Sequence, residues 1–312
     1  MRTDTTDTPE RGGHGAVGHV PVLLKEAIDF LAVQRGGTCL DATVALGGHS
    51  CEIARRLGAP GHLIGFDKDP AALAIVGGAT GALARPAEQG ADWPQITLIH
   101  GSFAEVAERI APATLDGLLA DLGVSSLQLQ DAARGFSFQA EGPLDMRMNP
   151  MSSETAEQVV NHIDERELAD VIYEFGEERR SRRIARAIVR ARPIRSTAHL
   201  AGVVSAAART MKSHGIHPAT LTFQGIRIFV NRELDDLREL LSAAPRLLKP
   251  GGRVVVISFH SLEDRIVKDA LRDGSKARVY NVLTKKPVTA TNAEVYRNPR
   301  SRSAKLRAAE KI

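Results

Sequence analysis

Hydrophobic and polar positions alternate along residues 19–127 in a way that fits strands and helices in turn. Runs rich in apolar and β-branched residues, typical of buried strands, fall at 38–40, 62–66, 96–100 and 115–121. Segments with apolar residues three or four positions apart, typical of amphipathic helices, fall at 22–31, 51–57, 70–84 and 103–110. The alternation predicts an α/β fold in which helices cover a parallel sheet.

The alternation stops at about residue 128, where the chain becomes charged and helical without a strand-like run. Helical periodicity then covers 165–175, 179–190 and 197–210. The α/β pattern resumes with a long amphipathic helix predicted over 223–241 and a strand over 253–258. We therefore expect a helical domain, residues 128–218, inserted into a discontinuous core formed by residues 19–127 and 219–312.

Length and composition agree with one large domain that carries an insertion. The chain has 312 residues, of which 43% are hydrophobic, so it can build a sizeable core. It has no apolar run near eighteen residues and no signal-peptide pattern, so we expect a cytoplasmic protein with no membrane partner. Residues 1–18 are expected to form a disordered tail. Cys39 and Cys51 have no metal-ligand spacing, so no metal site is predicted.

A turn of small residues follows the first predicted strand and opens a helix. It reads Asp41-Ala42-Thr43-Val44-Ala45-Leu46-Gly47-Gly48-His49-Ser50. Paired glycines allow a ligand to approach the backbone, and the free N–H groups at the start of a helix are donors for its polar end. About twenty residues further on, the second strand ends in Asp67, where this architecture holds an acid against a ribose hydroxyl. The pattern predicts a cofactor site for a ligand that contains ribose.

The turn favours S-adenosylmethionine over a nicotinamide dinucleotide. A dinucleotide site requires G-x-G-x-x-G, whereas this chain has Ala45 before Gly47 and Gly48. Asp41 would repel a pyrophosphate but could attract the cationic methionine end of S-adenosylmethionine, directly or through water. A Gly-Gly turn after a strand is nevertheless a weak motif by itself.

Basic residues are clustered although the net charge is only +4. Eight arginines lie between positions 179 and 195, and the last sixteen residues contain six basic side chains against one acid. Such clusters are typical of proteins that bind nucleic acid. The alternative is a solvated helix face whose arginine stems cover apolar surface. The RNA-contact candidates are Arg179, Arg182, Arg183, Arg186, Arg300 and Arg302.

Polar residues follow the two strands at 115–121 and 253–258. In an open α/β sheet the chemistry lies at such strand ends, which makes Asp121, Ser125, Ser126 and His260 catalytic candidates. The alternative for the serines is helix capping, and Ser261 with Asp264 also resembles a capping box. Asp121 has the stronger functional case, because a carboxylate that ends an apolar strand is costly unless it meets a ligand or a donor.

Several of these segments resemble one family over most of the chain. The similar stretches are 19–24, the turn at 41–50, 99–103, 121–128, 134–138, 142–148, 173–186, 217–231 and 258–265. Together they resemble the bacterial small-subunit ribosomal RNA cytosine N4-methyltransferases, the RsmH family, formerly MraW. Segments such as Gly142-Pro143-Leu144-Asp145-Met146-Arg147-Met148 are long and unusual, so the resemblance is specific.

The resemblance implies a Rossmann-like S-adenosylmethionine-dependent methyltransferase core with an inserted helical substrate domain. It implies methylation of N4 of the cytidine at position 1402 of 16S rRNA in the small ribosomal subunit. By motif, Gly47, Gly48 and His49 would hold the methionine part of S-adenosylmethionine and Asp67 its ribose. Phe103 would pack on the adenine, and Asp121 and Gln128 would complete the pocket. The oligomeric state stays open, a homodimer being one alternative.

This chain departs from the family pattern at two positions. Ala45 replaces a usual glycine, which would narrow the donor pocket if that position requires a positive φ, and Leu221 replaces a usual arginine. An alternative function is an RNA-binding ribosome assembly factor with a degenerate methyltransferase fold, for which Ala45 is the only hint in the sequence. A small-molecule methyltransferase is a third, which the basic clusters oppose. Methylation of cytosine C5 would need a cysteine nucleophile, but both cysteines lie inside predicted elements, so direct transfer to the exocyclic amine is expected.

Overall fold

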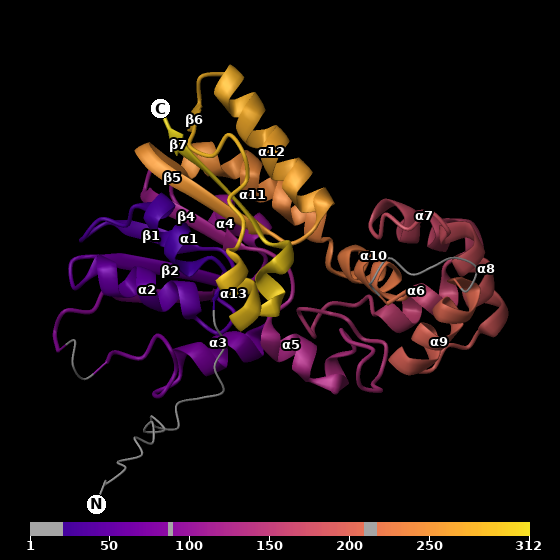
Figure 1. Cartoon of the computed structure of the whole chain (residues 1–312). Coiled ribbons are helices and arrows are strands. Elements are labelled where there is room, and N and C mark those ends of the chain that lie inside the picture. Colours follow the sequence, from indigo (N-terminus) through magenta and orange to yellow (C-terminus); the bar gives the residue numbers. More distant parts are fainter. Residues whose placement is uncertain (1–20, 87–89, 209–216) are drawn as a thin grey trace, which may run out of the picture.

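The computed structural model describes residues 21–86, 90–208 and 217–312, so the predicted tail at 1–18 lies outside the described residues. A seven-stranded sheet lies beside a unit of helices (Figure 1). The strands are β1 Thr38–Asp41, β2 His62–Asp67, β3 Gln95–His100, β4 Leu115–Asp121, β5 Leu248–Ser258, β6 Tyr280–Val282 and β7 Lys305–Lys311. Each of the five predicted strands is present, which confirms the α/β fold class.

The order of the strands across the sheet is β3-β2-β1-β4-β5-β7-β6. β1 to β5 run parallel, whereas β7 pairs antiparallel with both β5 and β6. The prediction of a wholly parallel sheet is therefore wrong at this edge. The sequence did not reveal β7 as a strand because Arg307 interrupts its apolar residues. In the fold the Arg307 side chain is buried and forms an ion pair with Asp264.

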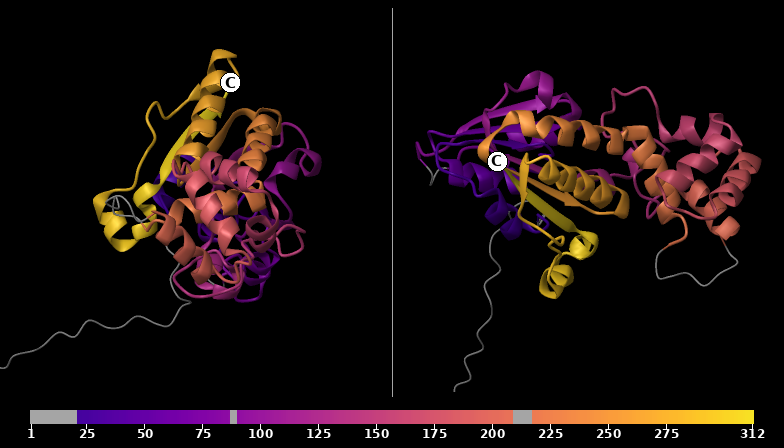
Figure 2. Two further views of the ribbon diagram at one scale, coloured as in Figure 1. Left: turned by 90° about the vertical axis from the view of Figure 1, so that its right-hand side faces the viewer. Right: turned by 90° about the horizontal axis from the view of Figure 1, so that it is seen from above.

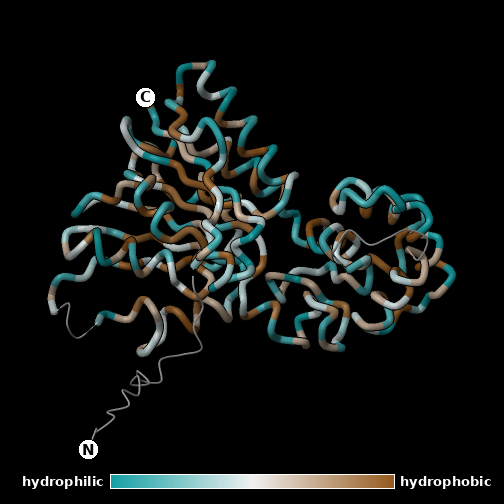
Figure 3. The backbone as a smooth tube through the Cα atoms, in the orientation of Figure 1, coloured by the Kyte–Doolittle hydropathy of each residue, from teal (hydrophilic) through white to brown (hydrophobic). Residues whose placement is uncertain are grey.

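Helices cover both faces of the sheet. One face carries α1 Leu24–Leu31, α2 Gly48–Leu57 and α3 Pro70–Gly77, and the other carries α4 Val106–Arg109, α11 Glu233–Leu247 and α12 Ser261–Lys276. Successive strand residues point to opposite faces, so Leu118 packs in one apolar cluster and Leu119 in the other. The hydropathy colouring shows apolar residues concentrated on the central strands between these layers (Figure 3).

Shorter elements complete the chain, and two predicted helices differ from the observed ones. α3 ends at Gly77 and does not continue to residue 84, because two glycines follow one another there. The predicted helix at 103–110 is a 3-10 turn, η2 Phe103–Glu105, followed by α4. The remaining elements outside the helical unit are α5 Ser126–Gln130, η3 Ala132–Arg134, α13 Asn292–Arg297 and η4 Pro299–Ser303.

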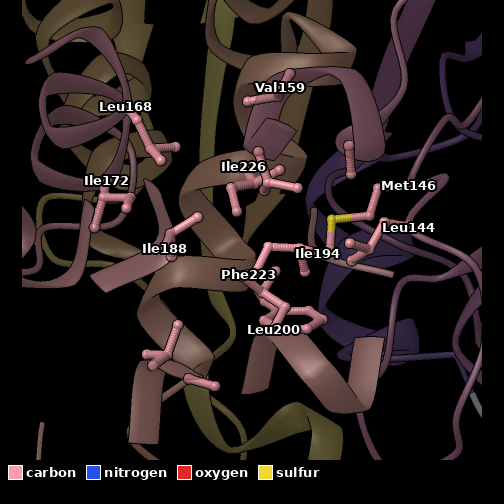
Figure 4. Close-up of a cluster of buried hydrophobic side chains, with 14 of the residues drawn as sticks. Leu144, Met146, Val159, Leu168, Ile172, Ile188, Ile194, Leu200, Phe223 and Ile226 are labelled. Carbon is pink, nitrogen blue, oxygen red and sulfur yellow. The ribbon is translucent and has the colours of Figure 1, made fainter. Parts of the chain in front are cut away.

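The helical unit has an apolar core of its own. It contains α6 Ala156–His162, α7 Glu165–Glu174, α8 Ser181–Ala191, α9 Thr197–Ala208 and α10 Thr220–Asn231. Figure 4 shows side chains from several of these helices meeting Leu144 and Met146 of the preceding loop. Phe223 and Ile226 of α10, which follows the predicted boundary at residue 218, also belong to this cluster, so α10 packs with the helical unit.

The predicted single helix at 223–241 is broken between α10 and α11. Arg232 has a left-handed backbone with φ of 52°, which ends one helix and starts the next. The break is held by Asn231, whose side chain accepts from Met148 N at 2.7 Å and donates to Met146 O at 2.7 Å. Because these partners are more than eighty residues away in the chain, local periodicity could not reveal the break.

The helical unit lies next to the carboxyl ends of the parallel strands (Figure 2). The chain enters it after β4 and α5 and returns through α10 and α11. Glu177, between α7 and α8, contacts the start of α12 through Ser261 and Arg265. The order of the sheet reverses between β1 and β4, and the crevice outside such a switch point is where open α/β sheets bind ligands.

Candidate functional site

A cavity of about 310 Å³ lies at this switch point, between the sheet and the helical unit. Its wall is formed by residues that follow β1, β2, β4 and β5, together with residues of α10 and η4. Seven of the predicted site residues line it: Asp67, Phe103, Asp121, Ser125, Ser126, Gln128 and His260. Arg300, predicted to contact RNA, also lines it.

Asp41 at the end of β1 supports the turn from inside the protein. Its carboxylate accepts from Ser50 Oγ at 2.5 Å and from Thr43 N at 3.0 Å, and the residue is 1% exposed. Burial raises its pKa. Direct contact between Asp41 and the methionine end of a ligand is therefore a wrong prediction, because the side chain does not reach the cavity.

The paired glycines of the turn are required by packing within the protein. A Cβ atom on Gly47 would collide with the Val76 side chain, and one on Gly48 would collide with Pro21. Gly47 also has a φ of 77°, which favours glycine at the N-cap of α2. Neither glycine lines the cavity, so their contact with a cofactor stays a prediction.

Ala45 has the left-handed backbone that makes its departure from glycine significant. Its φ is 47°, a conformation that costs an L-residue roughly 1–2 kcal/mol. The residue lines the cavity, and its N–H donates to Asp67 Oδ2 at 2.7 Å. Leu221, the second departure, is half-buried on α10 and does not line the cavity.

Asp67 at the end of β2 faces the cavity while it organises the turn that follows. Its Oδ1 accepts from Asp69 N at 2.8 Å, and its Oδ2 accepts from Ala45 N. Burial, opposed by these two hydrogen bonds, raises the pKa of Asp67 to about 6. Each oxygen retains acceptor capacity, so the carboxylate can still accept a hydroxyl hydrogen from a ligand.

Asp121 at the end of β4 is the most unusual group in the cavity wall. Its Oδ1 is buried and has no hydrogen-bond partner among the described residues. Its pKa is raised well above the usual range, first by burial and then by the negative charges of Asp41 and Glu263. A buried acceptor without a donor is costly, which indicates that a ligand supplies the missing donor or positive charge.

His49, at the start of α2, lies behind Asp121 rather than in the cavity wall. Its Nε2 lies 3.1 Å from the carbonyl oxygen of Val22, which can only accept, so this nitrogen carries a hydrogen. Its Nδ1 lies 3.6 Å from Asp121 Oδ2. A hydrogen bond between these two atoms would require a second hydrogen, either on Nδ1 or on the carboxyl group.

Ser125, the first of the two serines after β4, caps α5, as the structural alternative proposed. Ser125 Oγ accepts from Gln128 N at 3.2 Å, and Gln128 Oε1 accepts from Ser125 N at 3.0 Å, which forms a capping box. Gln128 Nε2 also donates to Asp69 Oδ2 at 3.1 Å, which joins α5 to the turn after Asp67. Ser126 Oγ accepts from the Arg300 guanidinium.

His260 caps α12, one residue before the predicted capping box. Its Nδ1 accepts from Glu263 N at 3.5 Å, and Glu263 Oε2 accepts from Phe259 N at 2.8 Å, so the box of Ser261 and Asp264 is wrong. Its Nε2 lies 3.2 Å from Glu263 Oε1. The Nδ1 lone pair therefore serves as the cap of α12.

Sequence patterns missed two buried ion pairs beside the cavity. Arg227 of α10 pairs with Glu233 of α11 at 2.8 and 2.9 Å, and both side chains line the cavity. Lys68 lines it as well and lies 2.5 Å from Asp236 of α11. Asp236 and Glu233 stand on the predicted polar face of one helix, so only the fold indicates their partners.

The first arginine cluster divides into structural and exposed members. Arg180 pairs with Glu178, and Arg192 donates to Val160 O and Ile163 O, so both stabilise the helical unit. α8 buries its apolar face and exposes its arginines at the end of the helical unit that is distant from the sheet (Figure 1). The exposed predicted residues are Arg179, Arg182, Arg183 and Arg186, the last of which lies 3.2 Å from Glu165.

The C-terminal cluster divides in the same way. Lys305 and Arg307 pair with Asp264, and Lys311 donates to Leu248 O at 2.7 Å. These three residues hold β7 in place and are not a free basic surface. Arg300 and Arg302 of η4 are exposed, as an RNA contact requires.

The fold and the cavity define a Rossmann-like methyltransferase of the S-adenosylmethionine-dependent class, with an acid at the end of β2 and another at the end of β4. Residues 16–312 match the MraW methylase family, and the chain belongs to that family. It is 70% identical to a protein named ribosomal RNA small subunit methyltransferase H from Koribacter versatilis, over 99% of both chains. It is 63% identical to the protein of the same name from Acidobacterium capsulatum, over 94% of this chain and 98% of that one.

Within the described ranges, every helix is too short or too polar to cross a membrane. The same part of the chain has no group of three or more His, Cys, Asp or Glu side chains placed to hold a metal ion.

Proposed function

We propose that this chain transfers a methyl group from S-adenosylmethionine to N4 of cytidine 1402 in 16S rRNA of the small ribosomal subunit. The observation that carries the proposal is the buried, unpartnered Asp121 Oδ1 at the switch point of a MraW-family methyltransferase fold. A carboxylate in this state suits an exocyclic amine, which offers hydrogen-bond donors and gains positive charge as it reacts.

The donor would be held along the carboxyl ends of β1, β2 and β4. Asp67 would accept from its ribose, Phe103 would pack on its adenine, and Gln128 with Asp121 would complete the pocket. Gly47, Gly48 and His49 would contact the methionine part through the start of α2, on the family pattern rather than on cavity contacts. When bound, S-adenosylmethionine supplies an activated methyl group and a positive charge.

A positive charge beside Asp121 favours the ionised carboxylate, whose pKa is otherwise raised by burial and by neighbouring acids. The ionised carboxylate would accept an N4 hydrogen and orient the amine lone pair toward the methyl group. Ser125 and Ser126 have hydroxyl oxygens that each accept one hydrogen bond already, so they are weaker acceptors than Asp121. Capture of the released proton by His260 stays a prediction, and solvent can serve equally well.

A covalent route through cysteine is disfavoured by the position of both thiols. Cys39 is buried in β1, where burial raises the pKa of its thiol to about 12. Cys51 lies within α2, and burial raises its pKa as well. Neither residue lines the cavity, so neither can attack a base held there. Direct attack by the amine requires no such nucleophile.

RNA would bind across both parts of the molecule. The exposed α8 residues Arg179, Arg182, Arg183 and Arg186 would neutralise phosphates on the helical unit, and Arg300 and Arg302 would do so next to the sheet. The arrangement supports an extended footprint, since α8 lies at the end of the helical unit that is distant from the sheet (Figure 1).

The direct test is methylation of small subunits from cells that lack this protein, followed by mass spectrometry of the 16S rRNA. We expect one N4-methylcytidine at position 1402 that depends on the protein and on S-adenosylmethionine. Donor and subunit binding without methyl transfer would instead support an assembly factor with a degenerate methyltransferase fold. Transfer to free nucleosides at a similar rate would support a small-molecule enzyme.

A further inference from the structure

The segment that precedes β7 is strongly basic and contributes none of the groups that would carry out methyl transfer. Residues 285–302 contain five basic side chains, namely Lys285, Lys286, Arg297, Arg300 and Arg302, and one acid, Glu294. Glu294 is used internally, because its Oε1 accepts from Leu23 N at 2.8 Å. All five basic residues are exposed. The segment therefore presents positive charge to solvent while its one acid fixes α13 against the start of α1.

Tyr296 projects from α13 into solvent among these arginines. It is 90% exposed, the largest value among the exposed large hydrophobic side chains of the described residues. Helix α13 is held by the Glu294 hydrogen bond, and Ser301 of η4 is completely buried, so the ring stands on an anchored element. An exposed aromatic ring on a fixed helix is available for stacking on a base.

Arg300 connects this segment to the cavity. Its guanidinium donates to the neutral Ser126 Oγ, whereas Lys68 and Arg227, the other basic residues of the cavity wall, each pair with a carboxylate. Among the described residues, Arg300 therefore has no acidic partner and has guanidinium donors to spare. A donor set of this kind, exposed at the mouth of the cavity, fits a phosphate oxygen.

We propose that Tyr296, Arg297, Arg300 and Arg302 form a docking surface for the single-stranded RNA that flanks the target cytidine. Arg300 contacts a phosphate next to the target nucleotide at the cavity mouth, and the Tyr296 ring stacks on a neighbouring base. A basic groove combined with an exposed aromatic ring is how proteins hold single strands. Tyr173, also exposed, differs because its helix, α7, is rich in acidic residues. The proposal rests on the proposed function, since it requires an RNA substrate.

The test compares Tyr296→Ala, Tyr296→Phe and Arg300→Ala in binding to unmethylated small subunits at several salt concentrations. Arg272→Ala on α12 removes one exposed charge elsewhere and is the matched control. We expect Tyr296→Ala to raise the dissociation constant by roughly 5- to 150-fold, while Tyr296→Phe stays near wild type, because stacking needs only the ring. Arg300→Ala should reduce the salt slope by about 0.7–0.9. Arg272→Ala should change neither quantity.

Donor affinity separates the alternatives for Arg300. A decrease in S-adenosylmethionine affinity in Arg300→Ala would assign the guanidinium to the donor carboxylate and overturn the phosphate contact. Equal weakening by Tyr296→Phe and Tyr296→Ala, or no weakening by either, would overturn stacking. If wild-type protein methylates subunits but none of these variants binds them more weakly, this surface is wrong and the proposed function stands. If the wild-type protein does not methylate subunits, both the docking surface and the proposed function are wrong.

Discussion

Replacing Asp121 by asparagine tests the central chemical inference with little change in shape. The carboxylate lines the cavity and has a buried, unpartnered Oδ1, whereas asparagine can present only a neutral acceptor or a donor there. A hydrogen bond to a charged group contributes about 1.5–3 kcal/mol, and here it would strengthen as positive charge develops on N4. The rate of the chemical step should therefore fall by roughly 10- to 150-fold.

The change should be measured by single-turnover methyl transfer with donor and small subunits both saturating, so that affinity and product release do not contribute. The pH dependence supplies a second readout. Because the pKa of Asp121 is raised in the ligand-free protein, the wild-type rate at subsaturating donor should increase with pH as the carboxylate ionises, and Asp121→Asn should lack this increase. A variant that keeps a rate within about two- to threefold of wild type would refute the catalytic role.

Stability measurements provide the control for Asp121→Asn. A carboxyl group with a raised folded pKa favours the folded state least above that pKa, so Asp121 costs stability at pH values above its unfolded pKa. The cost disappears below the unfolded pKa of about 3.9, where the group is protonated in both states. The ligand-free variant should therefore be at least as stable as wild type at about pH 7.5. A lower free energy of unfolding in Asp121→Asn would show that the slower rate reflects damage to the fold.

If Asp121→Asn lowers only the affinity for S-adenosylmethionine, Asp121 is a pocket residue, and Ser125, Ser126 and His260 remain the catalytic candidates.

Three further changes test the rest of the site. Asp67→Ala should weaken S-adenosylmethionine binding by roughly 2–3 kcal/mol in calorimetry. The affinity of the wild-type protein for S-adenosylmethionine should fall as Asp67 is protonated below about pH 6. Unchanged affinity in Asp67→Ala would exclude the ribose contact. Neutralising Arg182, Arg183 and Arg186 should reduce the slope of log affinity for RNA against log salt by about 0.7–0.9 for each phosphate that the protein no longer neutralises. Donor binding should be unaffected. An unaltered slope would mean that these arginines form only a solvated face of α8. Ala45→Gly should raise the free energy of unfolding by roughly 0.5–1 kcal/mol in urea denaturation, because it relieves a φ of 47°, and a decrease would contradict this strain.

The two acids at strand ends could be predicted because the signals that identify them are local. Asp67 and Asp121 each follow a run of apolar residues, and the ends of such runs must meet at one edge of a parallel sheet. The structure confirms that both line one cavity. Asp41 obeys the same rule but does not reach the cavity, because Ser50 and Thr43 hold its carboxylate inside the turn.

The roles of the polar residues near these acids depended on partners far away in the chain. The sequence places Arg307 in a basic C-terminal cluster, but in the fold it is buried in β7, between β5 and β6, where it pairs with Asp264. In the sequence, Arg300 cannot be distinguished from the other arginines of the basic cluster. In the structure it contacts Ser126, 174 positions earlier, and this contact places it at the cavity.

Local patterns in the chain were enough to predict the strands of the core, the helical character of the insertion and the acids that end β2 and β4. Each of these follows from hydrophobic periodicity or from a residue next to a hydrophobic run, which acts over a few positions. The antiparallel edge, the break at Arg232 and the assignment of α10 to the helical unit became visible only in the folded chain. Only the folded chain also shows which charges are paired and which line the cavity. Ion pairs and buried amides depend on side chains that folding brings together from distant segments.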